Sequence, residues 1–195
     1  MNIKKTLCLL LFAAGFLPAA KGQSFAVKTN LLYDATATAN AGIELALAPR
    51  WTFDLSGNYN AWPIDGQKWK HWMAQPELRY WFCDRYSRHF LGVHALGGRF
   101  NVGNIAALKD VRFLGIDFSN LADYRYQGWG AGAGIAYGYA FILGRHWNLE
   151  LELGAGYVYL EYDKYRCEDC ARHAGSGHNH YVGPTKAAIN LVYVF

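Results

Sequence analysis

The sequence predicts an all-β protein, an eight-stranded antiparallel transmembrane β-barrel. Three observations predict it: apolar and polar residues alternate with a period of two in several segments, the number of such segments is even, and short turns alternate with longer connections. Of the 195 residues, 52% are hydrophobic and 16% aromatic, but only 17% are charged, against about 25% in soluble domains. An unfolded chain could not keep so many aromatic rings hydrated, so the composition excludes disorder.

Residues 1–22 have the pattern of a secretory signal peptide. Lys4 and Lys5 precede an apolar run over 7–17, and small residues surround the predicted cleavage position. The run is shorter than the about 20 apolar residues that a membrane helix needs, and no comparable run follows it. We therefore expect residues 23–195 to form one domain, an outer-membrane β-barrel.

The charge balance excludes nucleic acid as an expected partner. Removal of the leader lowers Lys+Arg from 19 to 16 against 15 Asp+Glu, so the formal net charge falls from +4 to +1. Neither value gives the basic surface that binding to phosphates requires. The four cysteines are too few for a disulfide scaffold.

Alternation defines the strands one by one. In Trp51–Tyr59, for example, every second residue is aromatic, apolar or glycine, and the opposite parity is polar. The predicted strands are 24–34, 40–48, 51–61, 72–83, 89–98, 128–142, 147–160 and 181–195. Short turns at 49–50, 84–88 and 144–146 alternate with connections at 35–39, 62–71, 99–127 and 163–180. This is the arrangement of an OmpX/OmpA-like architecture with its short turns in the periplasm.

Aromatic residues gather at both ends of the predicted strands. Those that follow short turns are Trp51, Phe90 and Trp147, and those near the opposite ends are Tyr59, Trp62, Trp72, Trp129, Tyr157 and Tyr159. Rings at both rims suit the two interfaces of a membrane. We therefore expect the cell outer membrane as location and outer-membrane lipids as neighbours. A secreted soluble sandwich with aromatic-rich strands is the alternative.

The last strand carries a candidate assembly signal. Ile189, Leu191, Tyr193 and Phe195 share one parity, and the aromatic Phe195 ends the sequence. This pattern resembles the C-terminal signal that the barrel-assembly machinery recognises in bacterial outer-membrane barrels. The expected partner in assembly is that machinery, and the expected product is a monomer.

Charged residues occupy the inward parity of the predicted barrel. They are Lys28, Glu44, Asp54, Glu77, Arg79, Glu150, Glu152 and Lys186. An eight-stranded barrel is just wide enough for its own side chains. We therefore expect these residues to form a hydrogen-bonded polar network that plugs the lumen, with the inward glycines at 128, 130, 132 and 134 leaving room for long side chains. A narrow conducting pore is the alternative.

One cluster in the last predicted connection has metal-ligand spacing. Cys167 and Cys170 are separated by two residues, and His173, His178 and His180 follow them. Two thiolates at this spacing suit a tetrahedral zinc site, but no second cysteine pair completes a zinc motif. A local disulfide or two free thiols is the first interpretation, a metal site the second, and no role the third. We expect no cofactor.

A lipid-modifying enzyme is a further alternative, because some eight-stranded outer-membrane barrels act on lipids with a Ser/His pair near the rim. Histidines such as His71 and His94 are available. No serine can be placed beside any of them from the sequence, so no catalytic residue is assigned and no enzyme is expected.

Six segments resemble one known family. They are Val27–Thr38, the WTFDLSGNY of 51–59, the WKHWMAQ of 69–75, the HALGG of 94–98, the YRYQG of 124–128 and the GPTKAA of 183–188. Together they resemble the Bacteroidota family catalogued as domain of unknown function 3575, over nearly all of 23–195. The resemblance implies an outer-membrane-type barrel without an assigned activity, encoded in some genomes near fimbrial genes. It carries no established catalytic residues.

The expected role is therefore structural or one of surface interaction. A rigid barrel would present the connections 62–71, 99–127 and 163–180 to a partner such as a fimbrial subunit, because loops on rigid scaffolds are where binding resides. The apolar residues within 99–127 have two alternative roles. They pack against one another within the segment, or they fold over the barrel mouth or contact a partner. The competing functions are a small-solute channel and a lipid-modifying enzyme.

Overall fold

The computed structural model describes residues 25–62, 68–103, 112–113, 116–117, 124–166 and 173–195. Its elements are β1 (Phe25–Asn30), α2 (Leu31–Ala35), β2 (Ala39–Ala48), β3 (Trp51–Asn60), β4 (Lys68–Trp81), β5 (Arg88–Gly103), β6 (Arg112–Phe113), β7 (Ile116–Asp117), β8 (Tyr124–Ile142), β9 (Trp147–Arg166) and β10 (His173–Val194). The predicted signal peptide lies outside the described residues and stays a prediction.

Eight strands close into a barrel in the order β1-β10-β9-β8-β5-β4-β3-β2, and every neighbouring pair is antiparallel. The short strands β6 and β7 form a separate hairpin. The predicted all-β, eight-stranded antiparallel barrel is thereby confirmed.

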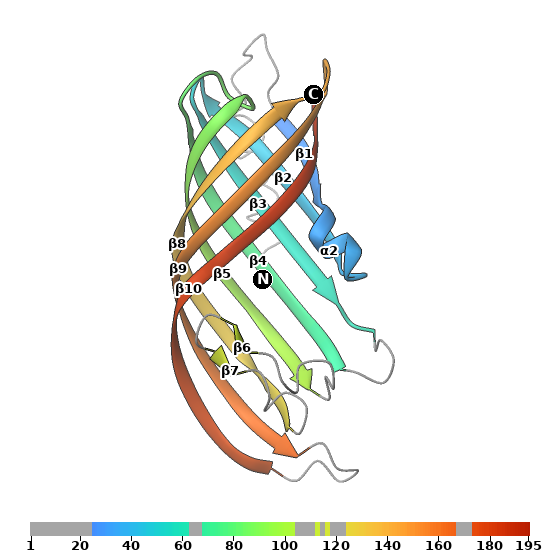
Figure 1. Ribbon diagram of the computed structural model, residues 1–195, viewed down its shortest axis with the longest axis vertical. Coiled ribbons are helices and arrows are strands. Elements are labelled where there is room, and N and C mark those ends of the chain that lie inside the picture. Colours follow the sequence, from blue (N-terminus) through green and yellow to red (C-terminus); the bar gives the residue numbers. More distant parts are fainter. Residues whose placement is uncertain (1–24, 63–67, 104–111, 114–115, 118–123, 167–172) are drawn as a thin grey trace, which may run out of the picture.

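The strands differ greatly in length, and the differences shape the barrel. They start level with one another at the end where the short turns lie, but β8, β9 and β10 run far beyond β2 and β3 at the opposite end (Figure 1). The strand β1 has only 6 residues, whereas β10 has 22. One side of the barrel therefore projects as a curved sheet.

The first predicted strand, 24–34, is wrong in its second half. The strand ends at Asn30, whose side chain caps α2 by accepting a hydrogen bond of 3.1 Å from the backbone N–H of Leu32. An asparagine favours this N-cap role because its side chain replaces a missing helical acceptor. No helix among the described residues is long and apolar enough to cross a membrane.

The predicted connections 62–71, 99–127 and 163–180 are too long. β4 already begins at Lys68, β5 continues to Gly103, β9 continues to Arg166, and β10 begins at His173. In the extensions of β9 and β10 both faces of the strands carry polar residues, so the period-two signal weakens although the backbone ladder continues. In the extension of β5 the alternation persists, with Arg99 and Asn101 opposite Phe100 and Val102.

The barrel is apolar outside and polar inside. Large apolar side chains such as Leu153 (72% exposed) and Val182 (79%) face outward, whereas Glu44, Arg79 and Glu150 are fully buried. Between Trp51 and Tyr59, the outward positions of β3 carry only phenylalanine, leucine and glycine. This distribution is the reverse of that in a soluble barrel.

A small apolar cluster closes the end of the lumen where the short turns lie. Its members are Ala26, Trp81, Tyr86, Phe90, Ala140, Val192 and Val194. The prediction that Phe90 belongs to an aromatic ring on the outer surface is therefore wrong. Phe90 is fully buried because it lies on the same face of β5 as the inward His94.

Candidate functional site

Arg79 is the centre of the charged interior. Its Nε lies 2.7 Å from Glu77 Oε1, its Nη1 lies 2.7 Å from Glu44 and 3.2 Å from Glu150, and its Nη2 lies 2.7 Å from Glu152. These carboxylates come from β2, β4 and β9, on different sides of the barrel. A guanidinium has five N–H donors in a fixed plane, so one side chain joins three strands across the lumen.

Two lysines complete this ionic network. Lys28 on β1 pairs with Glu44 and lies 3.4 Å from Glu150. Lys186 on β10 pairs with Glu77 and lies 3.1 Å from Glu152. All eight residues predicted for the lumen are thus brought together, the eighth being Asp54, which lies 3.2 Å from Lys28 Nζ. Every member is more than nine-tenths buried.

Glycines in the wall make room for the network. A Cβ added to Gly92 on β5 would come within 2.3 Å of Glu77 Oε1, and one added to Gly42 on β2 would come within 2.7 Å of Lys28 Cγ. The long ionic side chains therefore lie directly against the backbone of the neighbouring strand.

An aromatic floor lies on the turn side of the network. The Phe90 and Trp81 rings pack with their centroids 4.6 Å apart, and Trp81 Nε1 donates a 2.9 Å hydrogen bond to Thr52 Oγ1. Tyr86 folds into the barrel from the turn between β4 and β5, where its φ is +62°. Burial, and next the charge of Glu44, raise the pKa of the Tyr86 hydroxyl, which keeps it neutral.

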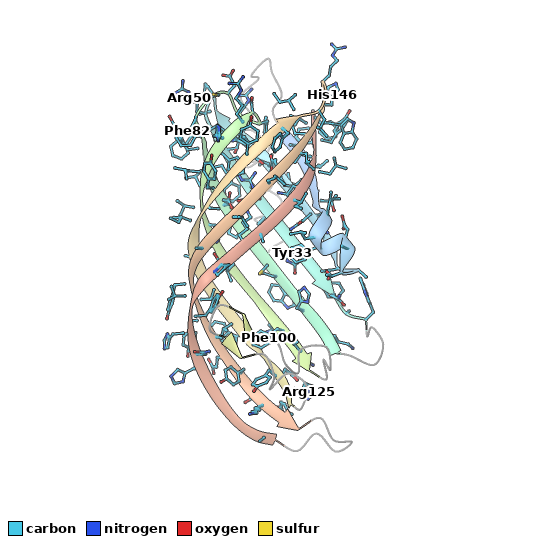
Figure 2. The ribbon with its side chains drawn as sticks, in the orientation of Figure 1. Tyr33, Arg50, Phe82, Phe100, Arg125 and His146 are labelled. Atoms are coloured by element: carbon cyan, nitrogen blue, oxygen red, sulfur yellow. The ribbon has the colours of Figure 1, made fainter. Side chains whose placement is uncertain are left out.

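A polar cavity of about 340 Å³ borders the network. Its lining includes amide and hydroxyl side chains, small apolar residues such as Ala187, and Lys28, Asp54 and Lys186 from the network. Tyr33, a residue of α2, lines it too, and Figure 2 shows this residue at the middle of the barrel, between the turn end with Arg50 and the opposite end with Arg125.

A comparison with protein-family models shows which family the chain belongs to. The model of the family described as a protein of unknown function (DUF3575) matches residues 7–195. The chain belongs to this family. The resemblance inferred from the six sequence segments is thereby confirmed. A search of the curated proteins finds no match.

One contact in this DUF3575 protein was missed by the sequence reasoning. The imidazole Nε2 of His94 lies 2.8 Å from Thr185 Oγ1. Thr185 shares the parity of the outward Ile189 and Leu191, but a bulge between Pro184 and Lys186 turns it inward, and its carbonyl oxygen accepts a 3.2 Å hydrogen bond from Gln75 Nε2. A Gly-Pro pair within an alternating strand is the signal that could have indicated this bulge.

The candidate metal ligands of the DUF3575 protein do not form one cluster in the part that is described. Cys167, Cys170 and the side chain of His173 lie outside it. His178 and His180 were expected in a connection, but they lie on β10 with exposed side chains, and His180 Nδ1 pairs with the hydroxyl of Tyr157. Within the described ranges, no group of three or more His, Cys, Asp or Glu residues could hold a metal ion.

The candidate assembly residues of the DUF3575 protein lie at the turn end of β10. Tyr193 packs against Trp147 with ring centroids 4.9 Å apart, and Phe195 stacks on Phe25 at 4.3 Å. Ile189 and Leu191 lie opposite Leu151 and Leu149 on β9. On its other side β10 pairs with β1, where Leu191 and Tyr193 lie opposite Thr29 and Val27, so this end of β10 also forms the seam where the last strand meets the first.

Proposed function

We propose that this DUF3575 protein is a closed β-barrel of the bacterial outer membrane with a structural or surface-interaction role. The observation that carries the proposal is the combination of an apolar outer face with an ionic interior above an aromatic floor. A barrel with this distribution is stable when hydrocarbon surrounds it, because its outward leucines then avoid water.

Aromatic rings at two levels support the membrane location. Trp51 and Trp147 are exposed near the short turns, and Tyr59, Trp129 and Tyr157 are exposed nearer the other end. Rings of this type sit at the headgroup level of both leaflets. The outer-membrane lipids are thus the proposed neighbours, and the seam strand with Phe195 is the proposed contact for the barrel-assembly machinery. A closed sheet needs no second copy for strand pairing, which favours a monomer.

The projecting ends of β8 and β9 form the proposed interaction surface. Tyr126 and Tyr162 pack with centroids 5.3 Å apart, Arg125 lies over the ring of Tyr165 at 4.8 Å, and Lys164 lies over Tyr126 at 5.7 Å. Tyrosine and arginine are the residues that most often carry binding energy in protein interfaces. The partner proposed from the family resemblance is a surface protein such as a fimbrial subunit.

A cavity at the mouth adds to this surface. It has a volume of about 550 Å³, and its lining includes Tyr59, Trp72, Arg99, Phe100 and Trp129. Such a concave, aromatic lining suits the insertion of a partner side chain.

The interior argues against the channel and gives the enzyme no support. Arg79 and its carboxylate partners cross the lumen, and the floor beneath them is apolar, so an ion would have to displace both layers. The contact between His94 and Thr185 lies inside the wall, away from the rim where lipid substrates would arrive, and we propose no catalytic role for it.

Site-specific photo-cross-linking on intact cells tests the interaction. A photoreactive residue replaces Asn179, which is exposed on the projecting part of β10, or Asp84, which is exposed in a short turn at the opposite end. We expect a discrete cross-linked protein from position 179 and not from position 84. Equal patterns of adducts from both positions, or none from 179, would contradict the surface role.

Conductance in a planar lipid bilayer tests the closed interior. The folded wild-type barrel is expected to give no stable ion current. Stable currents would overturn the plug and favour the channel.

A further inference from the structure

The last strand, β10, lacks a strand partner along most of one edge. On one side β9 pairs with β10 from His173 to Tyr193, but on the other side β1 pairs only with the segment from Asn190 to Val194. Between His173 and Ile189 no described strand pairs with this second edge. In Figure 1 this part of β10 runs away from β1 and α2 into the curved sheet that projects beyond β2 and β3.

Side chains replace the missing strand where the free edge leaves the barrel. Asn30 donates a 3.3 Å hydrogen bond to the carbonyl of Ala187 and accepts one of 3.2 Å from the N–H of Ile189. The hydroxyl of Tyr181 donates a 3.2 Å hydrogen bond to the carbonyl of Pro184. A proline has no N–H to offer, and it is found in sheets at such edges or at bulges. The edge of β10 next to the barrel is therefore protected against further pairing.

Farther out, the same edge has no such protection. Successive residues of an antiparallel strand direct their N–H and C=O groups to opposite neighbours. The carbonyl of Pro184 faces the free side, because the Tyr181 hydroxyl binds it there, and the pairing with β9 is regular from Gly175 to Pro184. Steps of two back from Pro184 give the residues whose backbone groups face the free edge, which are Val182, His180 and His178.

The residues of this outer edge also lack the features that keep strand edges from pairing. Natural edges carry lysine or other charged residues, proline, or a covering segment. Residues 178–183 read HNHYVG, without an acid, a lysine or a proline. Three successive residues of this segment, His178, Asn179 and His180, are exposed, and Val182 is 79% exposed. An open edge of this kind is a template for another strand.

The free edge on the other side of the projecting sheet has a different composition. β3 pairs with β4 as far as Asn60 and His71, so the first three residues of β4, 68–70, extend beyond it. Two of these three residues are lysines, the residue that most often protects an edge. The contrast indicates that the edge of β10, and not that of β4, is suited to pairing.

The outer face beside the free edge favours aromatic residues in the added strand. The His180 ring stacks on Tyr157 with centroids 5.9 Å apart, and the His178 ring stacks on Tyr159 at 6.3 Å. A strand next to β10 would place every second side chain beside these histidines, and aromatic pairs across strands stabilise a sheet.

We propose that the projecting edge of β10, from His178 to Val182, binds an extended segment of a partner protein as an added β-strand. Main-chain hydrogen bonds give affinity in this mode, and alternate side chains give specificity. The proposal rests on the proposed surface role and names how the partner is held.

Fluorescence anisotropy with the folded barrel in uncharged maltoside micelles tests the proposal. The probe is a labelled peptide with the sequence of 156–165, GYVYLEYDKY, from the strand that pairs with the other edge of β10. The control peptide has the same side chains but carries an N-methyl group on each amide from Tyr157 to Tyr162. We expect the control peptide to bind more weakly by about tenfold or more, because it has lost its backbone donors. Equal binding, or no binding of the unmethylated peptide at millimolar concentration, would overturn the proposal.

Two variants at one position separate the backbone from the side chain. His180→Pro removes an N–H that faces the free edge and leaves the ladder to β9 in place, whereas His180→Ala keeps this N–H. We expect the Kd of the peptide to rise by about tenfold in His180→Pro and to stay within twofold in His180→Ala. If both variants bind like the wild type, or if both lose binding equally, the peptide does not pair with this edge. Val182→Pro and Val182→Ala give the same comparison if His180→Pro fails to fold.

Sedimentation velocity of the barrel without peptide tests for another occupant. We expect a monomer. A dimer that His180→Pro dissociates would show that a second copy of the chain occupies the edge, and would contradict a partner protein.

Photo-cross-linking from position 179 in intact cells distinguishes this proposal from the surface role. We expect the adduct to persist in His180→Ala and to disappear in His180→Pro. An adduct that persists in both variants would leave the surface role standing and overturn the strand addition.

Discussion

The guanidinium of Arg79 lies over the ring of Phe90, with Cζ 4.5 Å from the ring centroid. This contact joins the ionic network to the aromatic floor. A desolvated cation over an aromatic face gains about 2 kcal/mol, so the two layers that close the lumen stabilise each other.

Replacement of Arg79 should be the most damaging single change in the interior. Arg79→Ala leaves four buried carboxylates without a shared partner, and breaking a buried ionic group in this way costs about 3–5 kcal/mol. The free energy of unfolding is measured by urea titration in lipid vesicles, followed by tryptophan fluorescence. Arg50→Ala, at an exposed turn residue, is the control and should change the value far less. Equal losses for the two variants would show that the network does not hold the barrel together.

Asp54→Asn should cost much less than Glu44→Gln. The Glu44 carboxylate pairs with Lys28 and Arg79 and accepts a hydrogen bond from Thr52. Asp54 lies 3.2 Å from Lys28 Nζ but makes no hydrogen bond with a described residue. Removal of the excess charge at Asp54 is expected to be neutral or stabilising, and Glu44→Gln to cost about 3 kcal/mol. The same urea titration checks the ranking, and a larger loss for Asp54→Asn would contradict an excess of carboxylates in a network where five of them face three cations.

A methyl group at Gly138 should disrupt the floor. Its Cβ would lie 2.2 Å from Cζ of Phe90, whereas nothing lies within 4 Å of a Cβ at Gly144. Gly138→Ala is therefore expected to lower the free energy of unfolding by about 1–3 kcal/mol through overpacking, and Gly144→Ala to leave it nearly unchanged. The double variant Gly138→Ala/Phe90→Leu should recover part of the loss. If the double variant recovers none of the lost free energy of unfolding, Phe90 is not the residue that the methyl group meets.

Asn30 should hold the seam between the first and last strands. Its side chain donates to Ala187 O at 3.3 Å, accepts from Ile189 N at 3.2 Å, and caps α2 at Leu32. Asn30→Ala is expected to cost about 1–2 kcal/mol. Hydrogen exchange should show faster exchange at the amides of Leu32 and Ile189, with Asn179→Ala as a control on the exposed part of β10. Unchanged protection at both amides would contradict a role of Asn30 in closing the wall.

Much of the fold could be predicted because each face of a strand has one environment. The alternation around Trp51–Tyr59 placed both Asp54 and Leu55 on the correct sides, and the inward charges on β2, β4 and β9 followed from the same rule. The far ends of β9 and β10 could not be predicted, because polar residues occupy both faces there and the period weakens.

The features of the interior that the sequence did not predict depend on local backbone geometry or on contacts between distant residues. The inward turn of Thr185 needs the bulge at Pro184, and the burial of Tyr86 needs a positive φ in the turn before β5. The meeting of His94 with Thr185 joins β5 to β10, which are not neighbours in the barrel. No spacing in the sequence reports such a contact.

The direction in which the apolar residues point is tested most directly by spin labels in lipid vesicles. Nitroxides are attached at positions 55 and 151, where outward leucines are the fifth residues of β3 and β9, and their accessibility to oxygen and to a water-soluble nickel complex is compared. We predict high accessibility to oxygen and low accessibility to nickel at both positions, as for groups within hydrocarbon. High nickel accessibility at both positions in the folded barrel would show that these faces meet water and would contradict an outer-membrane barrel.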